Sequence, residues 1–291
     1  MEKPVVTQAM IEAYDEYTHL TLDRRAFMEK LTKLAGSAAS AAVIAPLLAA
    51  NKASAEIVSA NDDRLDPSEV TFPGSSSPMK AYLVRPKAAT APLPAVIVIH
   101  ENRGLNPHIR DIARRLALEG FAALAVDFLS PLGGTPDDED KARDLFAKLD
   151  AESVVADAKA SLTYLTDLEG MNGKVGTVGF CWGGGIVNRF ATRAPDLKAG
   201  VAYYGMQPPI GDVPAIKAPL LLHYAGLDDR VNAGIDAYRD ALDGNDKVFE
   251  IYVYDGVNHA FNNDTSAARY DKNAADLAWK RTVAFLKKYL S

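Results

Sequence analysis

Short apolar runs alternate with stretches of helical spacing from residue 70 to the end of the 291-residue chain. The clearest run, 95–100, reads Ala-Val-Ile-Val-Ile-His, as expected for a strand covered on both faces. This alternation predicts an α/β fold in which helices cover both faces of a mostly parallel central sheet of about six strands. An antiparallel start is expected at 70–72 and 79–85, further strands at 121–128, 174–180, 198–204, 218–225 and 248–254, and helices at 106–119, 137–148, 153–168, 183–193, 233–242 and 267–289.

Residues 1–55 do not follow this alternation and are interpreted as an N-terminal extension to a single domain, 56–291. Arg24-Arg25, an alanine-rich run at 34–50 and the small-x-small sequence at 53–55 together resemble a twin-arginine export signal, which implies a periplasmic protein. Asp23 and Glu29 depart from the usual signal. The alternative is a helical arm, 5–20 and 27–34, that packs on the body or on a second subunit of a cytoplasmic protein. The short apolar run is a poor permanent membrane span in either case.

Composition narrows the function classes. The net charge is −6 and the pI is about 5.4, so the chain has no electrostatic footprint for nucleic acid. The single cysteine excludes an intramolecular disulfide and a multi-cysteine metal cluster. No phosphate-binding loop or dinucleotide fingerprint is present, so neither a cofactor nor a metal is expected. The expected partner is a small molecule, and the expected assembly is a monomer or homodimer.

The lone cysteine lies where a strand turns directly into a helix. The strand 174–180 ends in Gly179-Phe180-Cys181-Trp182-Gly183, which is a nucleophile elbow with cysteine in place of serine. The glycines allow the two backbones to approach closely, and the turn forces the nucleophile into a strained conformation. The helix N-terminus favours a thiolate and an oxyanion. We therefore predict that Cys181 is a nucleophile on an α/β-hydrolase fold.

Two later strand ends supply partners in the order nucleophile, acid, histidine. Asp228 follows the strand 218–225 in an Asp-x-x-Val sequence, and His259 follows the strand 248–254. Asp228 would orient the imidazole and stabilise its protonated form. Of the other histidines, His223 is expected in the core, and His100 is expected to shape the oxyanion region. His19 lies in the extension.

These motifs together resemble the dienelactone hydrolase family over about residues 70–290, through Gly-x-Cys-x-Gly-Gly, the pair His100-Glu101, Asp-x-x-Val and a late Gly-x-x-His-x-Phe. The resemblance implies a carboxymethylenebutenolidase-like carboxylic-ester hydrolase. It also implies that Glu101 interacts with the resting thiol until substrate displaces it. The backbone amides of Asn102 and Trp182 would form the oxyanion hole, each contributing roughly 3–4 kcal/mol to acyl transfer.

The sequence departs from the family where two arginines would hold a substrate carboxylate. Neither the segment after 121–128 nor the segment after His259 contains an arginine, so dienelactone itself is not the expected substrate. The expected substrate is a small ester, enol lactone or thioester. A non-catalytic thiol redox sensor on the same scaffold is the alternative. Candidate substrate-binding residues, each with a structural alternative, are Arg103, Phe128, Tyr204 and Phe261.

Overall fold

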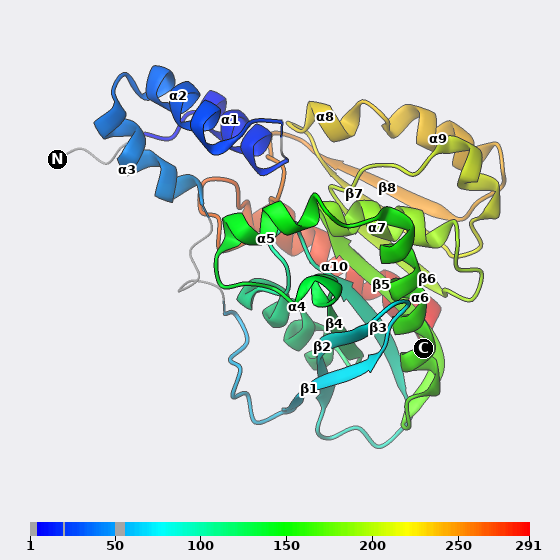
Figure 1. Ribbon diagram of the computed structural model, residues 1–291. Helices are drawn as coiled ribbons and strands as arrows, with labels where there is room; N and C mark the ends of the chain where they lie inside the picture. The colour runs from blue at the N-terminus through cyan, green and yellow to red at the C-terminus, as the bar shows by residue number, and fades with distance from the viewer. Residues whose placement is uncertain (1–4, 20, 50–55) are drawn as a thin grey trace.

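The protein is described by a computed structural model, which covers residues 5–19, 21–49 and 56–291. Its centre is an eight-stranded sheet of order β1-β2-β4-β3-β5-β6-β7-β8 (Figure 1). Only the pairs β1–β2 and β2–β4 are antiparallel, so six strands run parallel, as the sequence predicts. The strands are β1 Leu65–Pro73, β2 Pro78–Pro86, β3 Leu93–Ile99, β4 Ala122–Asp127, β5 Met171–Phe180, β6 Ala199–Tyr203, β7 Leu220–Ala225 and β8 Phe249–Tyr254.

Helices cover both faces of this sheet, and the strands alternate accordingly. In β3, Val96 and Val98 belong to the core on the side of α4 and α10, whereas Ile97 and Ile99 belong to the core on the side of α6, α7 and α9. His223 in β7 is fully buried, which confirms its expected place in the core. The predicted α/β architecture is confirmed. The helices of the body are α4 Pro107–Leu118, α5 Glu139–Phe146, α6 Ala151–Asp167, α7 Trp182–Ala191, α8 Asp229–Asn232, α9 Ile235–Asp243 and α10 Lys272–Leu290.

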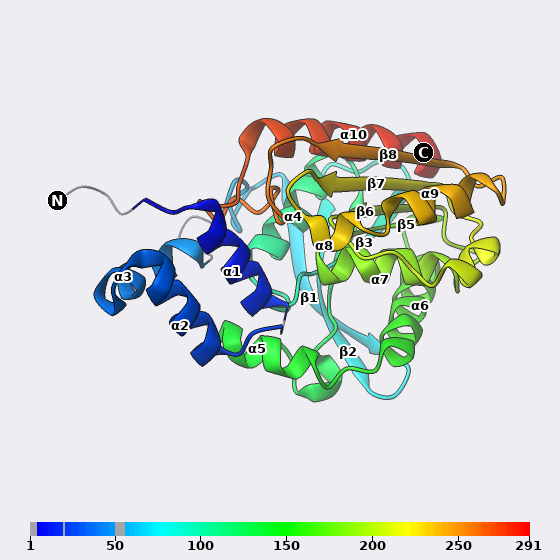
Figure 2. The same cartoon turned by 90° about the horizontal axis from the view of Figure 1, so that it is seen from above.

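The N-terminal extension forms three helices beside the body: α1 Gln8–Thr18, α2 Arg24–Ala35 and α3 Ala38–Leu48 (Figure 2). We call residues 5–49 the arm. Its buried apolar residues form a separate cluster, and among the described apolar residues of the body Ala268 packs against it. Asp23 caps α2 and Ser37 caps α3 through their side chains. The expected cleavage sequence at 53–55 lies outside the described residues.

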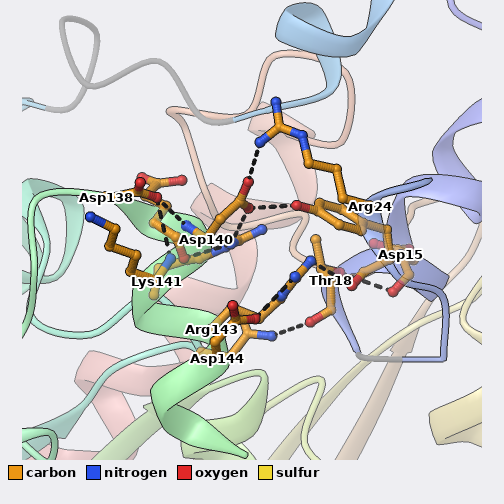
Figure 3. Close-up of polar contacts among 12 residues, drawn as sticks. Asp15, Thr18, Arg24, Asp138, Asp140, Lys141, Arg143 and Asp144 are labelled. Atoms are coloured by element: carbon orange, nitrogen blue, oxygen red, sulfur yellow. Dashed lines mark hydrogen bonds and ion pairs between the residues drawn. The ribbon is translucent and has the colours of Figure 1, made fainter. Parts of the chain in front are cut away.

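Polar contacts hold the arm against the body. Asp140 on α5 accepts hydrogen bonds from Arg24 Nη1 at 2.7 Å and from the Tyr17 hydroxyl at 2.6 Å (Figure 3). On the other side of α1, Arg269 Nη1 donates to Asp15 Oδ1 at 3.1 Å. These contacts place the end of α1 over the carboxyl ends of the parallel strands, where ligand sites in such sheets form.

The apolar run of the extension is divided between two helices, α2 and α3, that meet at a bend. Within the ranges that the structure describes, no single helix is long and apolar enough to cross a membrane. The pair α2 and α3 passes a test of length and composition only when taken together, and the two are bent by 112°.

Candidate active site

The predicted elbow is present between β5 and α7. Cys181 has φ 55° and ψ −115°, a conformation that non-glycine residues rarely adopt. A Cβ added at Gly183 would lie 2.4 Å from the carbonyl oxygen of Ile99, and one added at Gly179 would lie 2.2 Å from the carbonyl oxygen of Gly183. The helix therefore begins in contact with the neighbouring strand. This close packing leaves the Cys181 side chain at the end of the sheet, only 8% exposed.

Asp228 and His259 meet beside the elbow. His259 Nδ1 lies 2.5 Å from Asp228 Oδ2, and both side chains are buried. The other oxygen, Asp228 Oδ1, accepts from the backbone N–H of Val231 at 3.2 Å and so caps the short helix α8. Because each carboxylate oxygen has its own donor, the acid has one orientation. His259 Nδ1 donates to Asp228, so Nε2 is the ring nitrogen that lies near the Cys181 sulfur.

Local charges set the protonation of this pair. Burial alone would lower the pKa of His259, but the charges of Asp228 and Cys181 outweigh it and raise this pKa to about 10. Burial acts on Asp228 in the raising direction, yet the nearby His259 holds the pKa of that carboxyl below its usual value. The arrangement therefore favours an imidazolium–carboxylate pair next to the sulfur.

The expected oxyanion donors are the amides of Asn102, after β3, and Trp182, at the start of α7. In the part of the chain that the structure describes, neither backbone N–H donates to another protein group, whereas the side-chain amide of Asn102 donates to the Thr18 carbonyl. His100 organises this corner: its Nδ1 donates to the Glu101 carbonyl at 2.8 Å, and its Nε2 accepts from Phe128 N at 3.1 Å. Its ring stacks on the Trp182 indole, with centroids 5.6 Å apart.

Glu101 is 6% exposed and lies in the same corner. Its Oε2 accepts a hydrogen bond from Asn263 Nδ2 at 2.7 Å, and its Oε1 is buried with no partner among the described residues. Among the described residues, no hydrogen bond joins Glu101 to Cys181. The sulfur is instead in hydrogen-bond contact with a histidine of the arm. Asn263 was not singled out from the sequence, because its contact joins residues 162 positions apart.

That histidine is His19, at the end of α1. Its Nε2 lies 3.4 Å from Cys181 Sγ, and its Nδ1 donates to the Asp15 carbonyl at 2.7 Å. Its ring meets the His259 ring edge to face, with centroids 4.7 Å apart. Burial, followed by the charge on His259, lowers the pKa of His19 well below its usual value. Sequence analysis placed His19 in the extension and gave it no role, whereas the structure brings it into the site.

Two cavities adjoin the sulfur. The larger, of about 360 Å³, is within the range of small-molecule sites, and Thr18, His19, Cys181, Trp182 and Tyr204 are among its lining residues. Three arginines reach its wall from other elements: Arg143, Arg189 and Arg230. The smaller, of about 20 Å³, also borders Cys181 and is lined in part by Glu101, His259 and Arg269.

The four expected substrate-binding residues occupy different places. Tyr204 lines the larger cavity, and its ring lies 4.9 Å from the His259 ring. Phe128 and Phe261 are fully buried and line neither cavity, so a binding role does not fit their positions. Arg103 lines the smaller cavity, but its guanidinium donates to the Glu139 carbonyl at 2.9 Å and pairs with Asp140. The structural alternative suits Arg103 better, because its charge is already compensated.

Several known proteins are similar to this chain in sequence and in fold. The chain matches the dienelactone hydrolase family over residues 79–290. It is 34% identical to a provisionally named carboxymethylenebutenolidase of Escherichia coli O157:H7, covering 83% of this chain and 94% of that protein. A relative of the same provisional name from Saccharolobus solfataricus is 31% identical, covering 76% of this chain and 98% of its own.

Among solved structures, a provisionally assigned dienelactone hydrolase from Klebsiella pneumoniae is similar. It superposes with a TM-score of 0.71 at 32% identity, covering 77% of this chain and 99% of that one. None of these relatives supports the redox-sensor alternative. The chain therefore belongs to the dienelactone hydrolase family and is an enzyme, a hydrolase of α/β-hydrolase fold.

Proposed function

We propose that the enzyme hydrolyses small activated esters, enol lactones or thioesters with a Cys181–His259–Asp228 triad. The observation that carries the proposal is the arrangement at the elbow. His259 is bonded to Asp228 at 2.5 Å through Nδ1, and Cys181 and His259 offer ligand atoms within 4.8 Å of each other. A nucleophile, a base and an orienting acid in reach of one another are the requirements of covalent acyl transfer.

The reaction follows from this geometry. The Cys181 thiolate attacks the carbonyl carbon, and the amides of Asn102 and Trp182 donate to the oxyanion that forms. When the tetrahedral intermediate collapses, the carbon–oxygen bond to the alcohol breaks and the His259 imidazolium protonates the leaving oxygen. His259 then takes a proton from water, which attacks the thioester and releases the acid. Because a thiolate is itself a good leaving group, the enzyme favours substrates whose alcohol leaves readily.

The substrate proposal excludes dienelactone as the preferred compound. The segments that carry the family's carboxylate-binding arginines hold Pro131 and Asn262 here. The larger cavity nevertheless has cations, because Arg143, Arg189 and Arg230 reach its wall from other elements. A comparison of p-nitrophenyl acetate with the hemisuccinate ester of the same phenol distinguishes a site that prefers neutral substrates from one that binds a substrate carboxylate. A neutral site turns over the acetate at least as fast as the hemisuccinate.

The test of the triad is p-nitrophenyl acetate hydrolysis by the wild type, Cys181→Ala and Cys181→Ser. The alanine variant should lose activity, and electrospray mass spectrometry of the quenched wild type should show one acetyl group on Cys181. The serine variant is the matched control, because it keeps a side chain of nearly the same size and has a much weaker nucleophile. Equal rates in the wild type and Cys181→Ala would end the proposal.

We also propose, from the sequence, that residues 1–55 direct twin-arginine export to the periplasm, the alternative being a cytoplasmic protein with a permanent arm. Arg24 is paired with Asp140, whereas Arg25 pairs, among the described residues, with Glu29 on its own helix. Export would therefore require α2 to leave the body. Cell fractionation of the wild type and an Arg24→Lys/Arg25→Lys variant tests this. The proposal requires wild type in the periplasm and the variant in the cytoplasm; size-exclusion chromatography with light scattering decides between monomer and homodimer.

A further inference from the structure

The smaller cavity beside the nucleophile has an unusual lining. Its volume, about 20 Å³, is sufficient for one water-sized species. His19, Cys181, His259 and Glu101 all line it. The first three bring one ligand atom each within 4.8 Å of one another. A thiol and two imidazoles are the ligands that Zn²⁺ prefers in proteins.

Both imidazoles are oriented as metal ligands are. His19 Nδ1 donates to the Asp15 carbonyl at 2.7 Å, and His259 Nδ1 donates to Asp228 at 2.5 Å. A histidine that binds a metal through one ring nitrogen usually donates its other ring N–H to a carbonyl or carboxylate in this way. In both rings the remaining nitrogen is Nε2, and that of His19 already lies 3.4 Å from Cys181 Sγ.

Two buried polar atoms of the lining have no hydrogen-bond partner among the residues that the structure describes. They are His259 Nε2 and Glu101 Oε1, and their residues are 3% and 6% exposed. Leaving such atoms unpaired costs about 1–3 kcal/mol each, so a bound group that satisfies them is favoured. Among the lining residues, the carboxylates of Glu101 and Glu139 balance the guanidiniums of Arg103 and Arg269, and the Asp228 carboxylate bonded to His259 adds negative charge behind the site.

We propose that this cavity binds a single Zn²⁺ ion through Cys181 Sγ and the Nε2 atoms of His19 and His259, with Glu101 in the same cavity lining. Zinc bonds of about 2.3 Å to sulfur and 2.0–2.1 Å to nitrogen require these three atoms, which lie within 4.8 Å of one another, to move closer together on binding. Binding releases one proton, from the Cys181 sulfur or from His259, because the sulfur must be a thiolate and the imidazole neutral. Nothing is oxidised or reduced.

The consequence is reversible inhibition of the enzyme. A metal on the sulfur and on the base removes both groups from acyl transfer, and this part of the inference rests on the proposed function. The arm makes the site specific, because His19 belongs to α1 while the other two ligands belong to the body. A chain with its arm displaced keeps Cys181 and His259 but loses the third ligand.

The test uses the tag-free full chain in a zinc titration against a chromogenic chelator, with Co²⁺ as a spectroscopic substitute. We expect one zinc per chain and a sulfur-to-cobalt charge-transfer band that is absent in Cys181→Ala. His19→Gln should bind zinc at least about 100-fold more weakly, since even the loss of an outer-shell partner costs 10–100-fold. Gln8→Ala is the matched control. Gln8 lies on the same helix and donates to Asn258, the residue before His259, but it is not a zinc ligand. The zinc affinity of Gln8→Ala should therefore equal that of the wild type.

The inference is overturned if the wild type has no one-to-one site, if the cobalt complex shows no thiolate band, or if His19→Gln binds within threefold of the wild type. Ester hydrolysis is measured in parallel, with and without a chelator. If the protein hydrolyses esters in a Cys181-dependent way but binds no zinc, the metal site is refuted and the triad is unaffected. Zinc binding in a chain that hydrolyses no ester would refute the triad and leave the metal site intact.

Discussion

The arm supplies Thr18 and His19 to the site, and its own stability depends on one aromatic ring. Phe27 on α2 is 4% exposed. It stacks on Tyr17 with centroids 4.8 Å apart and meets Tyr14 edge to face at 5.8 Å. Truncation of a buried phenylalanine to alanine costs about 3–5 kcal/mol. Helices of 11 or 12 residues are only marginally stable without tertiary packing. The arm therefore has too little folding free energy to absorb a loss of this size.

We therefore expect Phe27→Ala to unfold the arm and leave the body folded. The buried arm cluster is separate from the two cores of the sheet, and Ala268 is its apolar contact with the body. Limited proteolysis with mass spectrometry should remove the arm from the variant under conditions that leave the wild type whole. Calorimetry should show the main unfolding transition of the body nearly unchanged.

The matched control is Val43→Ala in α3. Val43 is 56% exposed, so the same kind of truncation in the same arm should change neither the proteolysis pattern nor the melting curve. The reasoning is refuted if Phe27→Ala resists protease as the wild type does. It is equally refuted if the body melts together with the arm at a lower temperature, because the two would then form one cooperative unit.

Three further predictions concern the triad and the elbow. Asp228→Asn should lower kcat by roughly 10³–10⁴-fold in stopped-flow ester hydrolysis, because the amide no longer orients His259, while circular dichroism stays unchanged. Since the pKa of His259 is raised to about 10, its contribution to stability is fully present below about pH 6.5 and is lost as the pH rises through about 10. Urea unfolding should thus show a larger loss between these pH values in the wild type than in His259→Gln, and equal losses would contradict the cited charges. Gly183→Ala should cost about 1–3 kcal/mol or more in urea unfolding, since its Cβ would lie 2.4 Å from the Ile99 carbonyl oxygen, whereas Gly211→Ala, with open space around it, should be neutral.

The parts of the site that the sequence predicts are those encoded locally. The elbow is visible because the glycines around Cys181 follow directly from the close approach of strand and helix. Asp228 is visible because a residue that caps a short helix with one oxygen and faces the site with the other gives an Asp-x-x-Val pattern. The apolar runs predict the strands because residues covered on both faces cannot be polar.

The parts that the sequence does not predict depend on contacts between distant segments. His19 and Cys181 are 162 residues apart, and no spacing within the extension indicates which way α1 lies on the body. The same holds for the hydrogen bond from Asn263 to Glu101. This bond engages one oxygen of the carboxylate that the family resemblance implied would interact with the thiol. Phe128 and Phe261 carry apolar side chains at strand ends, a position equally suited to a cavity wall and to a core.

The Asp228 carboxylate has a consequence for attempts to remodel the enzyme. One oxygen begins α8 and the other aligns the imidazole, so a longer or reshaped loop after β7 would turn His259 away from its present orientation. Libraries that widen the larger cavity through residues 229–234 would therefore return mostly inactive clones. Diversity is better introduced from α5, whose Phe146 lines the same cavity and shares no bond with the triad.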